Sequence, residues 1–203
     1  RASFLNTGNA VFYPFDRQIH IRDDLEPFSR GEAVHIAIDF NVAIMAAAAF
    51  ALRSDQLHWL WEAQGSADTQ SLCDKIKEDF PNTKIYVYPD PSGKARKTSA
   101  AVGVTDFTIL RDAGFTIRAR NTNRMLKSAA GNASMFFAPE LKGLLRSVEG
   151  TQWKEKANSE DMDTATIDKS QGVEHFSDGL RYACDYLFPI KGGSSGVRRG
   201  SRF

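Results

Sequence analysis

Three acidic residues could form a metal site, and two of them end strand-like segments, where a carboxylate is costly unless a cation accompanies it. Asp39 ends the apolar segment HIAID, and Asp90 ends the segment IYVYPD. An acid in a β-run is disfavoured by propensity, and once desolvated it needs a charge partner. The third acid, Asp178, lies in the first turn of an amphipathic helix expected over residues 173–189. Taken alone, each acid is more simply explained as a turn residue or as part of a solvated helix face.

Together, three carboxylates from two strands and a helix would form an oxygen-rich site suited to Mg²⁺ or Mn²⁺. Two such ions, about 3.5–4 Å apart, can activate a water and stabilise the leaving oxygen in phosphodiester cleavage. A zinc site is not indicated, because Cys73 and Cys184 have no metal-type spacing. We interpret both cysteines as reduced, buried thiols. The acids therefore predict a site for two Mg²⁺ or Mn²⁺ ions.

The segment PSGKARKTS, residues 91–99, has a superficial likeness to a phosphate-binding loop. A P-loop needs the pattern G-x-x-x-x-G-K-[ST]. Here Lys94 is followed by Ala95, and Tyr88 stands where the first glycine is needed. Pro91 also removes a backbone N–H from the segment that would have to bind phosphate. We therefore interpret this segment as a turn that follows a functional acid.

A basic stretch directly follows that turn. Residues 94–127 carry eight Lys or Arg and two acids, a local charge of +6 in a chain whose formal net charge is +1. Such residues can bind a nucleic-acid backbone without reading its sequence, and a generally basic surface is the alternative. The residues predicted to bind DNA are Lys94, Arg96, Lys97, Arg120, Arg124 and Lys127.

Two further residues are weaker candidates for the site. Asp163 lies in the acidic segment 155–178 and could complete a metal shell, although a solvated acidic loop is the commoner case. His175 lies three residues before Asp178, so it can reach the same side of the helix start. It could orient a water or contact a phosphate, whereas a surface histidine is again the commoner case.

The elements around these residues predict an α/β domain with a mixed sheet flanked by helices. Three consecutive strands are expected as a meander, over residues 34–40, 43–53 and 56–64. The middle one contains four consecutive alanines, which favour a helix by propensity, but its position between two strands favours a strand. Helices and strands then alternate: helices over 68–80, 104–114, 122–130, 138–150 and 173–189, and strands over 84–90 and 115–120.

The composition, 42% hydrophobic and 25% charged, is typical of a globular domain. The longest apolar run, residues 42–52, is far below the roughly 20 residues of a membrane span, so no membrane partner is expected. We expect a linker or packed arm over residues 1–30, a domain over 31–190 and a basic flexible tail over 191–203. Because the chain begins at Arg1, we also expect a fragment of a longer protein.

The ordered set AIDFN (37–41), YPDPSG (88–93) and HFSDGLRYACDYLFP (175–189) resembles the nuclease domain of the large terminase subunit of tailed bacteriophages. The segments at 2–15 and 136–153 are similar to that family as well. The resemblance implies a ribonuclease H-like fold. It also implies a metal-dependent endonuclease, a hydrolase that cuts concatemeric viral double-stranded DNA during genome packaging with little sequence specificity.

Carried over residue by residue, the family's three catalytic and metal-binding acids correspond to Asp39, Asp90 and Asp178. Gly179 stands where the family usually has Ala. Residues 1–30 correspond to the join with an ATPase domain that this chain lacks, and no Walker pattern is found. The resemblance further implies two bound Mg²⁺ or Mn²⁺ ions, the portal and the small terminase subunit as partners, a location in the host cytoplasm and absence from the mature virion. We expect the isolated domain to be a monomer, and its tail to contact DNA or the portal.

Two alternatives remain open from the sequence. One is another ribonuclease H-like nuclease, of the resolvase or integrase type. The other is a non-catalytic module that docks DNA or the portal and whose acids are structural.

Overall fold

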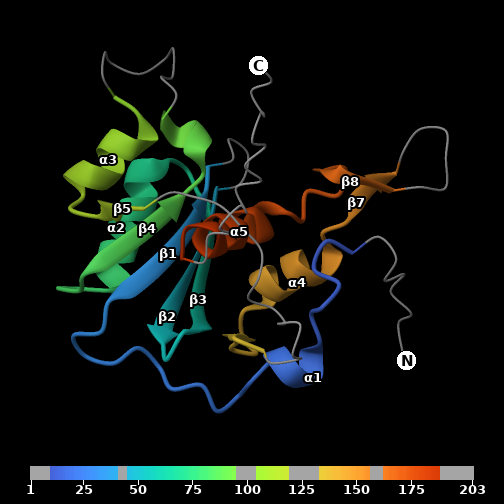
Figure 1. The fold of residues 1–203 in the computed structure, drawn as a ribbon. Coiled ribbons are helices and arrows are strands. Elements are labelled where there is room, and N and C mark those ends of the chain that lie inside the picture. Colours follow the sequence, from blue (N-terminus) through green and yellow to red (C-terminus); the bar gives the residue numbers. More distant parts are fainter. Residues whose placement is uncertain (1–9, 41–44, 95–103, 119–132, 156–161, 188–203) are drawn as a thin grey trace, which may run out of the picture.

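A computed structural model describes residues 10–40, 45–94, 104–118, 133–155 and 162–187 of the 203-residue chain (Figure 1). Its centre is a six-stranded sheet of order β5-β4-β1-β2-β3-β6. The strands are β1 (Val34–Asp39), β2 (Met45–Arg53), β3 (Gln56–Ser66), β4 (Ile85–Pro89), β5 (Thr116–Ile117) and β6 (Met135–Phe137). β1, β2 and β3 form an antiparallel meander, whereas β4, β5 and β6 join by parallel pairing. The predicted mixed sheet with its opening meander is therefore confirmed.

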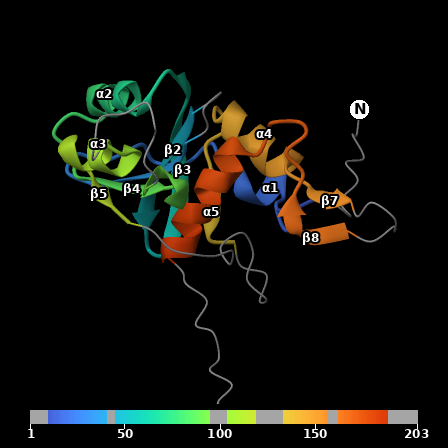
Figure 2. The same cartoon turned by 90° about the horizontal axis from the view of Figure 1, so that it is seen from above.

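Helices cover both faces of this sheet, as Figure 2 shows. One face packs against α2 (Thr69–Asp79) and α3 (Asp106–Asp112), and the other against α4 (Lys142–Gly150) and α5 (His175–Leu187). A strand whose two faces are both covered can be apolar at every position. This explains the alanine-rich segment: the residues of β2 from Met45 to Ala51 are all buried. The tertiary position of the segment overrides its helix propensity.

The segment before the sheet packs against the α4 and α5 face. It contains α1 (Arg17–His20), and it pairs with Phe137 at the outer strand β6 through the N–H of Arg22. Val11 and Phe12 are buried in the same core as α5. The described part of residues 1–30 is thus a packed arm. Its connection to an ATPase domain stays a prediction.

One helix start was predicted wrongly and one strand was missed. The helix expected from residue 138 begins at Lys142, because Pro139 and Glu140 form a turn. β6 was not expected at all, since it has three residues and forms only by pairing with β3. A hairpin of β7 (Trp153–Glu155) and β8 (Met162–Ile167) follows α4. The helix expected over 122–130 and the basic tail lie outside the described residues.

Both cysteines are buried, as predicted, Cys73 in α2 and Cys184 in α5. Within the described ranges, no helix has the length and apolar character needed to cross a membrane.

Candidate active site

Two of the predicted acids meet because their strands are parallel neighbours. β1 and β4 pair with Ile38 opposite Pro89, and the N–H of Asp90 donates to the carbonyl oxygen of Ile38 at 2.9 Å. This hydrogen bond extends the ladder by one step beyond β4. Asp39 and Asp90 therefore lie side by side at the carboxyl edge of the sheet, where parallel strands place ligand sites.

Helix α5 brings the third acid to this edge. The helix crosses β1 so closely that a Cβ at Gly179 would lie 3.5 Å from the Cβ of Ala37. Asp178, the residue before this contact, is 5% exposed, and its N–H donates to the carbonyl of Glu174. The solvated helix face that was the simpler explanation for Asp178 is therefore wrong.

The charges of the other two acids act on Asp39. Asp39 is 7% exposed, and burial, the largest cause, raises its pKa from 3.8 to about 6. The negative charge of Asp178 raises that pKa further and the charge of Asp90 adds to it, whereas a hydrogen bond from His175 opposes the shift. Burial and like charge both disfavour an ionised carboxylate. Asp39 therefore sits where a cation would be strongly favoured.

His175 is part of the same cluster. Its Nδ1 lies 3.2 Å from Oδ2 of Asp39, and both side chains are 9% exposed. The surface position that was the commoner expectation for this histidine is wrong. The ring holds one oxygen of Asp39 from the side of α5.

Two basic side chains hold Asp178. Lys169 Nζ donates to its Oδ2 at 2.9 Å, and Arg181 Nη1 donates to its Oδ1 at 3.2 Å. Burial lowers the pKa of Lys169, but the hydrogen bond and charge of Asp178 outweigh it and raise that pKa overall. Glu174 and Asp39 act in the same direction as Asp178.

Tyr182 completes the described surroundings, one helical turn after Asp178. Burial raises its pKa first, and the charges of Asp90, Asp178 and Asp39 add to the shift. Its position at i+4 from Asp178 is visible in the sequence and could have suggested this neighbour. Lys169 has no such signal, because it lies in a loop.

The turn after Asp90 is a 3₁₀ turn, Pro91–Lys94, rather than a phosphate loop. The N–H of Ser92 donates to Oδ1 of Asp90 at 2.8 Å, which fixes the carboxylate at the start of the turn. Gly93 is needed for close packing, since a Cβ there would lie 2.7 Å from Cδ2 of Phe40. The interpretation of the segment as a turn is confirmed for residues 91–94, and its remainder lies outside the described residues.

The other predicted residues divide into three groups. Lys94 is exposed, and its Nζ lies 5.6 Å from the ring centre of Phe107. Asp163 lies in β8, opposite Lys154 in the hairpin register. The remaining predicted DNA-binding residues lie outside the described residues: Arg96, Lys97, Arg120, Arg124 and Lys127.

The chemistry of the donor set suits a hard divalent cation, because its ligands are carboxylate oxygens. Burial and mutual repulsion destabilise the negative charges of these carboxylates, and a bound cation would stabilise them. In the part of the chain that the structure describes, no group of three or more Asp, Glu, His or Cys side chains is arranged as a shell that could hold a metal ion. The contacts of Asp178 with Lys169 and Arg181 occupy oxygens that such a shell would use.

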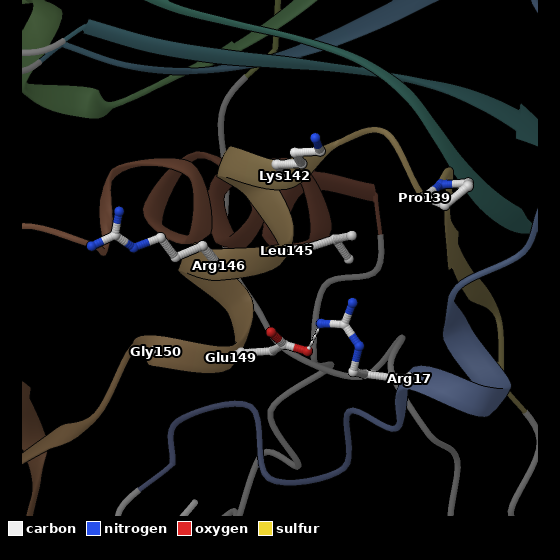
Figure 3. A pocket seen from close by; sticks show the side chains of 7 residues that line it. All are labelled: Arg17, Pro139, Lys142, Leu145, Arg146, Glu149 and Gly150. Atoms are coloured by element: carbon white, nitrogen blue, oxygen red, sulfur yellow. Dashed lines mark hydrogen bonds and ion pairs between the residues drawn. The ribbon is translucent and has the colours of Figure 1, made fainter. Parts of the chain in front are cut away.

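A pocket of about 430 Å³ lies elsewhere, between α1 and α4 (Figure 3). Arg17 and Glu149 form an ion pair across it. None of the predicted site residues that the structure describes lines it; its described lining residues are Arg17, Pro139, Lys142, Leu145, Arg146, Glu149 and Gly150.

No protein-family model and no curated protein sequence matches the chain. Several solved structures share its fold. A large terminase from a thermophilic bacteriophage matches with a TM-score of 0.66 at 16% identity over 89% of this chain, which spans 46% of that protein. The nuclease domain of the P22 large terminase matches at 0.57, with 15% identity over 88% of this chain and 93% of that domain.

The large terminase nuclease of a second thermophilic phage, G20c, with bound magnesium, matches at 0.55, with 14% identity over 89% of this chain and 98% of that one. The resemblance that the sequence motifs carry is thus confirmed in the fold: the chain has the α/β fold of large terminase nuclease domains, the ribonuclease H-like fold. It spans about half the length of the first of these three proteins.

Proposed function

From the terminase nuclease fold and the carboxylate cluster at its sheet edge, we propose that this chain is a metal-dependent endodeoxyribonuclease of a phage DNA-packaging machine. The observation that carries the proposal is the burial of Asp39 beside Asp178 and Asp90, which raises its pKa to about 6. An arrangement that is unfavourable for the protein alone is typical of sites that bind a ligand or perform catalysis. The bound magnesium of the G20c nuclease supports a divalent ion as that ligand.

In this proposal Asp39, Asp90 and Asp178 hold two Mg²⁺ or Mn²⁺ ions. When bound, such ions supply an activated water and stabilise the leaving oxygen of a phosphodiester. His175 keeps Asp39 oriented through its contact with Oδ2. The backbone N–H of Ser92 does the same for Asp90. Asp163 stays a candidate for completing the metal shell.

The substrate in this proposal is concatemeric viral double-stranded DNA, cut with little sequence preference. Lys94 is exposed four residues after Asp90, so it can contact a phosphate beside the site. Arg96, Lys97, Arg120, Arg124 and Lys127 are proposed to extend this phosphate contact. The portal and the small terminase subunit as partners, and the host cytoplasm as location, belong to the same proposal.

The test is cleavage of supercoiled plasmid by the chain in the presence of Mn²⁺. We expect nicking and linearisation by the wild type, and a loss of about 100-fold or more in Asp39→Asn and Asp90→Asn, since each removes a carboxylate from the ion-binding site. Glu149→Gln, which removes one negative charge in the α1–α4 pocket, is the matched control and should cut normally. Undiminished cutting by both site variants would contradict the proposal.

Four-way junctions and RNA–DNA hybrids, tested beside linear duplex, separate this proposal from a resolvase-type nuclease. Preference for a junction would replace the packaging role by that alternative. Calorimetry that detects no Mn²⁺ binding would instead favour a non-catalytic docking module.

A further inference from the structure

Lys169 is one of two described cations that contact the proposed metal site directly. It follows β8 by two residues, and its Nζ binds Oδ2 of Asp178 at 2.9 Å. The side chain of Lys169 is 62% exposed, whereas that of Asp178 is 7% exposed. The lysine therefore reaches from the solvent side to a carboxylate that the fold holds in place.

The ammonium group is not confined to a single acid. The charges of Glu174 and Asp39 act on Lys169 in addition to that of Asp178. It thus lies in the combined negative field of these three acids. A +1 ammonium and a +2 ion repel each other, and both compete for the same carboxylate oxygens.

Lys169 and Arg181 differ in how easily each side chain could be displaced from Asp178. Arg181 is three residues from Asp178 on the same helix, and its side chain is 34% exposed. Lys169 lies in a loop, next to a turn in which the N–H of Ser170 donates to Asp168. The lysine of this pair is largely exposed and flexible, so a more highly charged cation can displace its ammonium from the buried carboxylate.

We propose that Lys169 is an exchangeable counter-ion of the metal site: its ammonium neutralises Asp178 until a divalent ion displaces it. The inference rests on the proposed function, because it takes Asp178 to be an ion-binding residue. Without a bound metal ion, the ammonium of Lys169 reduces the repulsion among the three clustered acids, so the fold tolerates them. It also means that the lysine sets the ion concentration at which the site fills.

The test is calorimetric titration of the chain with Mn²⁺ alone. We expect Lys169→Ala to bind Mn²⁺ about 3- to 10-fold more tightly than the wild type, because the ion no longer has to displace a partly exposed ammonium. Lys169→Arg should bind like the wild type or more weakly. Lys142→Ala, an exposed lysine on α4 with the same charge change, is the matched control and should leave the affinity unchanged.

A second measurement uses the same variants in plasmid cleavage. The Mn²⁺ concentration for half-maximal cutting should fall in Lys169→Ala by the same factor as the dissociation constant. An affinity equal to or weaker than that of the wild type would overturn the inference, and so would an equal gain in Lys142→Ala. The proposed function would survive those results provided that the wild type binds Mn²⁺ and Asp178→Asn does not. Absence of binding in both the wild type and Lys169→Ala would overturn both.

Discussion

The cluster at the sheet edge and the pocket between α1 and α4 both gather charged side chains, but they do so in opposite ways. In the pocket, Arg17 pairs with Glu149, and their side chains are 61% and 23% exposed. At the sheet edge, Asp39 is 7% exposed and lies among acids whose charges raise its pKa. One region joins opposite charges in solvent, and the other buries like charges together.

The difference separates a structural use of charge from a functional one. An exposed ion pair contributes little to stability and needs no ligand. Buried like charges lower stability, so folds retain them mainly at sites where a ligand or a reaction uses them. His175, Lys169 and Arg181 reduce this unfavourable energy without removing it, since the pKa of Asp39 remains about 6.

The largest expected contrast between the two regions is the response to metal. Mn²⁺ at 100 times its dissociation constant should raise the free energy of unfolding of the wild type by about 2.7 kcal/mol, because it binds only the folded state. Asp178→Asn should lose most of this gain, and Glu149→Gln should keep it. Thermal unfolding with Mn²⁺ and with EDTA measures the difference. An equal gain in all three proteins would remove the distinction between the two regions.

The second contrast concerns the protein without metal. Asp39→Asn should raise the free energy of unfolding at pH 7 by about 1–3 kcal/mol, because it removes a carboxylate whose pKa burial and neighbouring charge raise from 3.8 to about 6. The protonated acid favours the fold, so the contribution of Asp39 is full below pH 3.8 and is lost as the pH rises through 6. The advantage of the variant should therefore appear between these values and be complete above pH 6.

Urea unfolding of both proteins in EDTA, at several pH values, measures this advantage. His35 changes stability in the opposite direction, since burial first and the charge of Arg118 second lower its pKa from 6.5 to about 4. That stability is lost as the pH falls from 6.5 toward 4, but it is common to both proteins and cancels in the difference. A variant that is less stable than the wild type at pH 7 would mean that Asp39 is mainly a structural residue.

The sequence predicts the scaffold of the acidic cluster better than its neighbours. The period-two and apolar patterns of the first three strands indicate the meander, and the parallel pairing of β1 with β4 then places Asp39 beside Asp90. The pairing of Asp178 with Lys169 depends on where a loop folds back, and no local pattern records that. Prediction from sequence is thus reliable where backbone periodicity decides and weak where a single side chain spans two elements.

The start of α4 shows the same limit. The expected helix begins at a proline, but the observed one begins at Lys142 because Glu62 of β3 accepts hydrogen bonds from the N–H groups of Gly143 and Leu144, at 2.9 and 2.6 Å. A carboxylate from a distant strand caps this helix in place of a local residue. Such a cap becomes visible only once the tertiary fold is known.

Two glycines test how tightly the elements around the acids are packed. Gly93→Ala should lower the free energy of unfolding by about 1–3 kcal/mol, because the new Cβ would overlap the Phe40 ring, where Cδ2 would be 2.7 Å away, and would lie 3.1 Å from Cδ1 of Phe107. Gly179→Ala should instead raise it by about 0.5–1 kcal/mol through helix propensity, since its Cβ would make an ordinary contact at 3.5 Å with Ala37. Chemical denaturation of the two variants measures both signs. A loss of stability in Gly179→Ala would mean that α5 packs too closely on β1 to accommodate a methyl group at this position.

The smallest expected effect belongs to the pocket. Glu149→Gln removes the partner of Arg17, and it should lower the free energy of unfolding by less than about 1 kcal/mol, because solvent screens the largely exposed guanidinium of Arg17. Even this loss should shrink at 1 M salt, where the screening length falls to about 3 Å. Denaturation at low and high salt measures the change. A loss that exceeds the predicted bound and persists at high salt would show that Glu149 is not a screened surface partner, and that the two regions do not differ in the way their charges act.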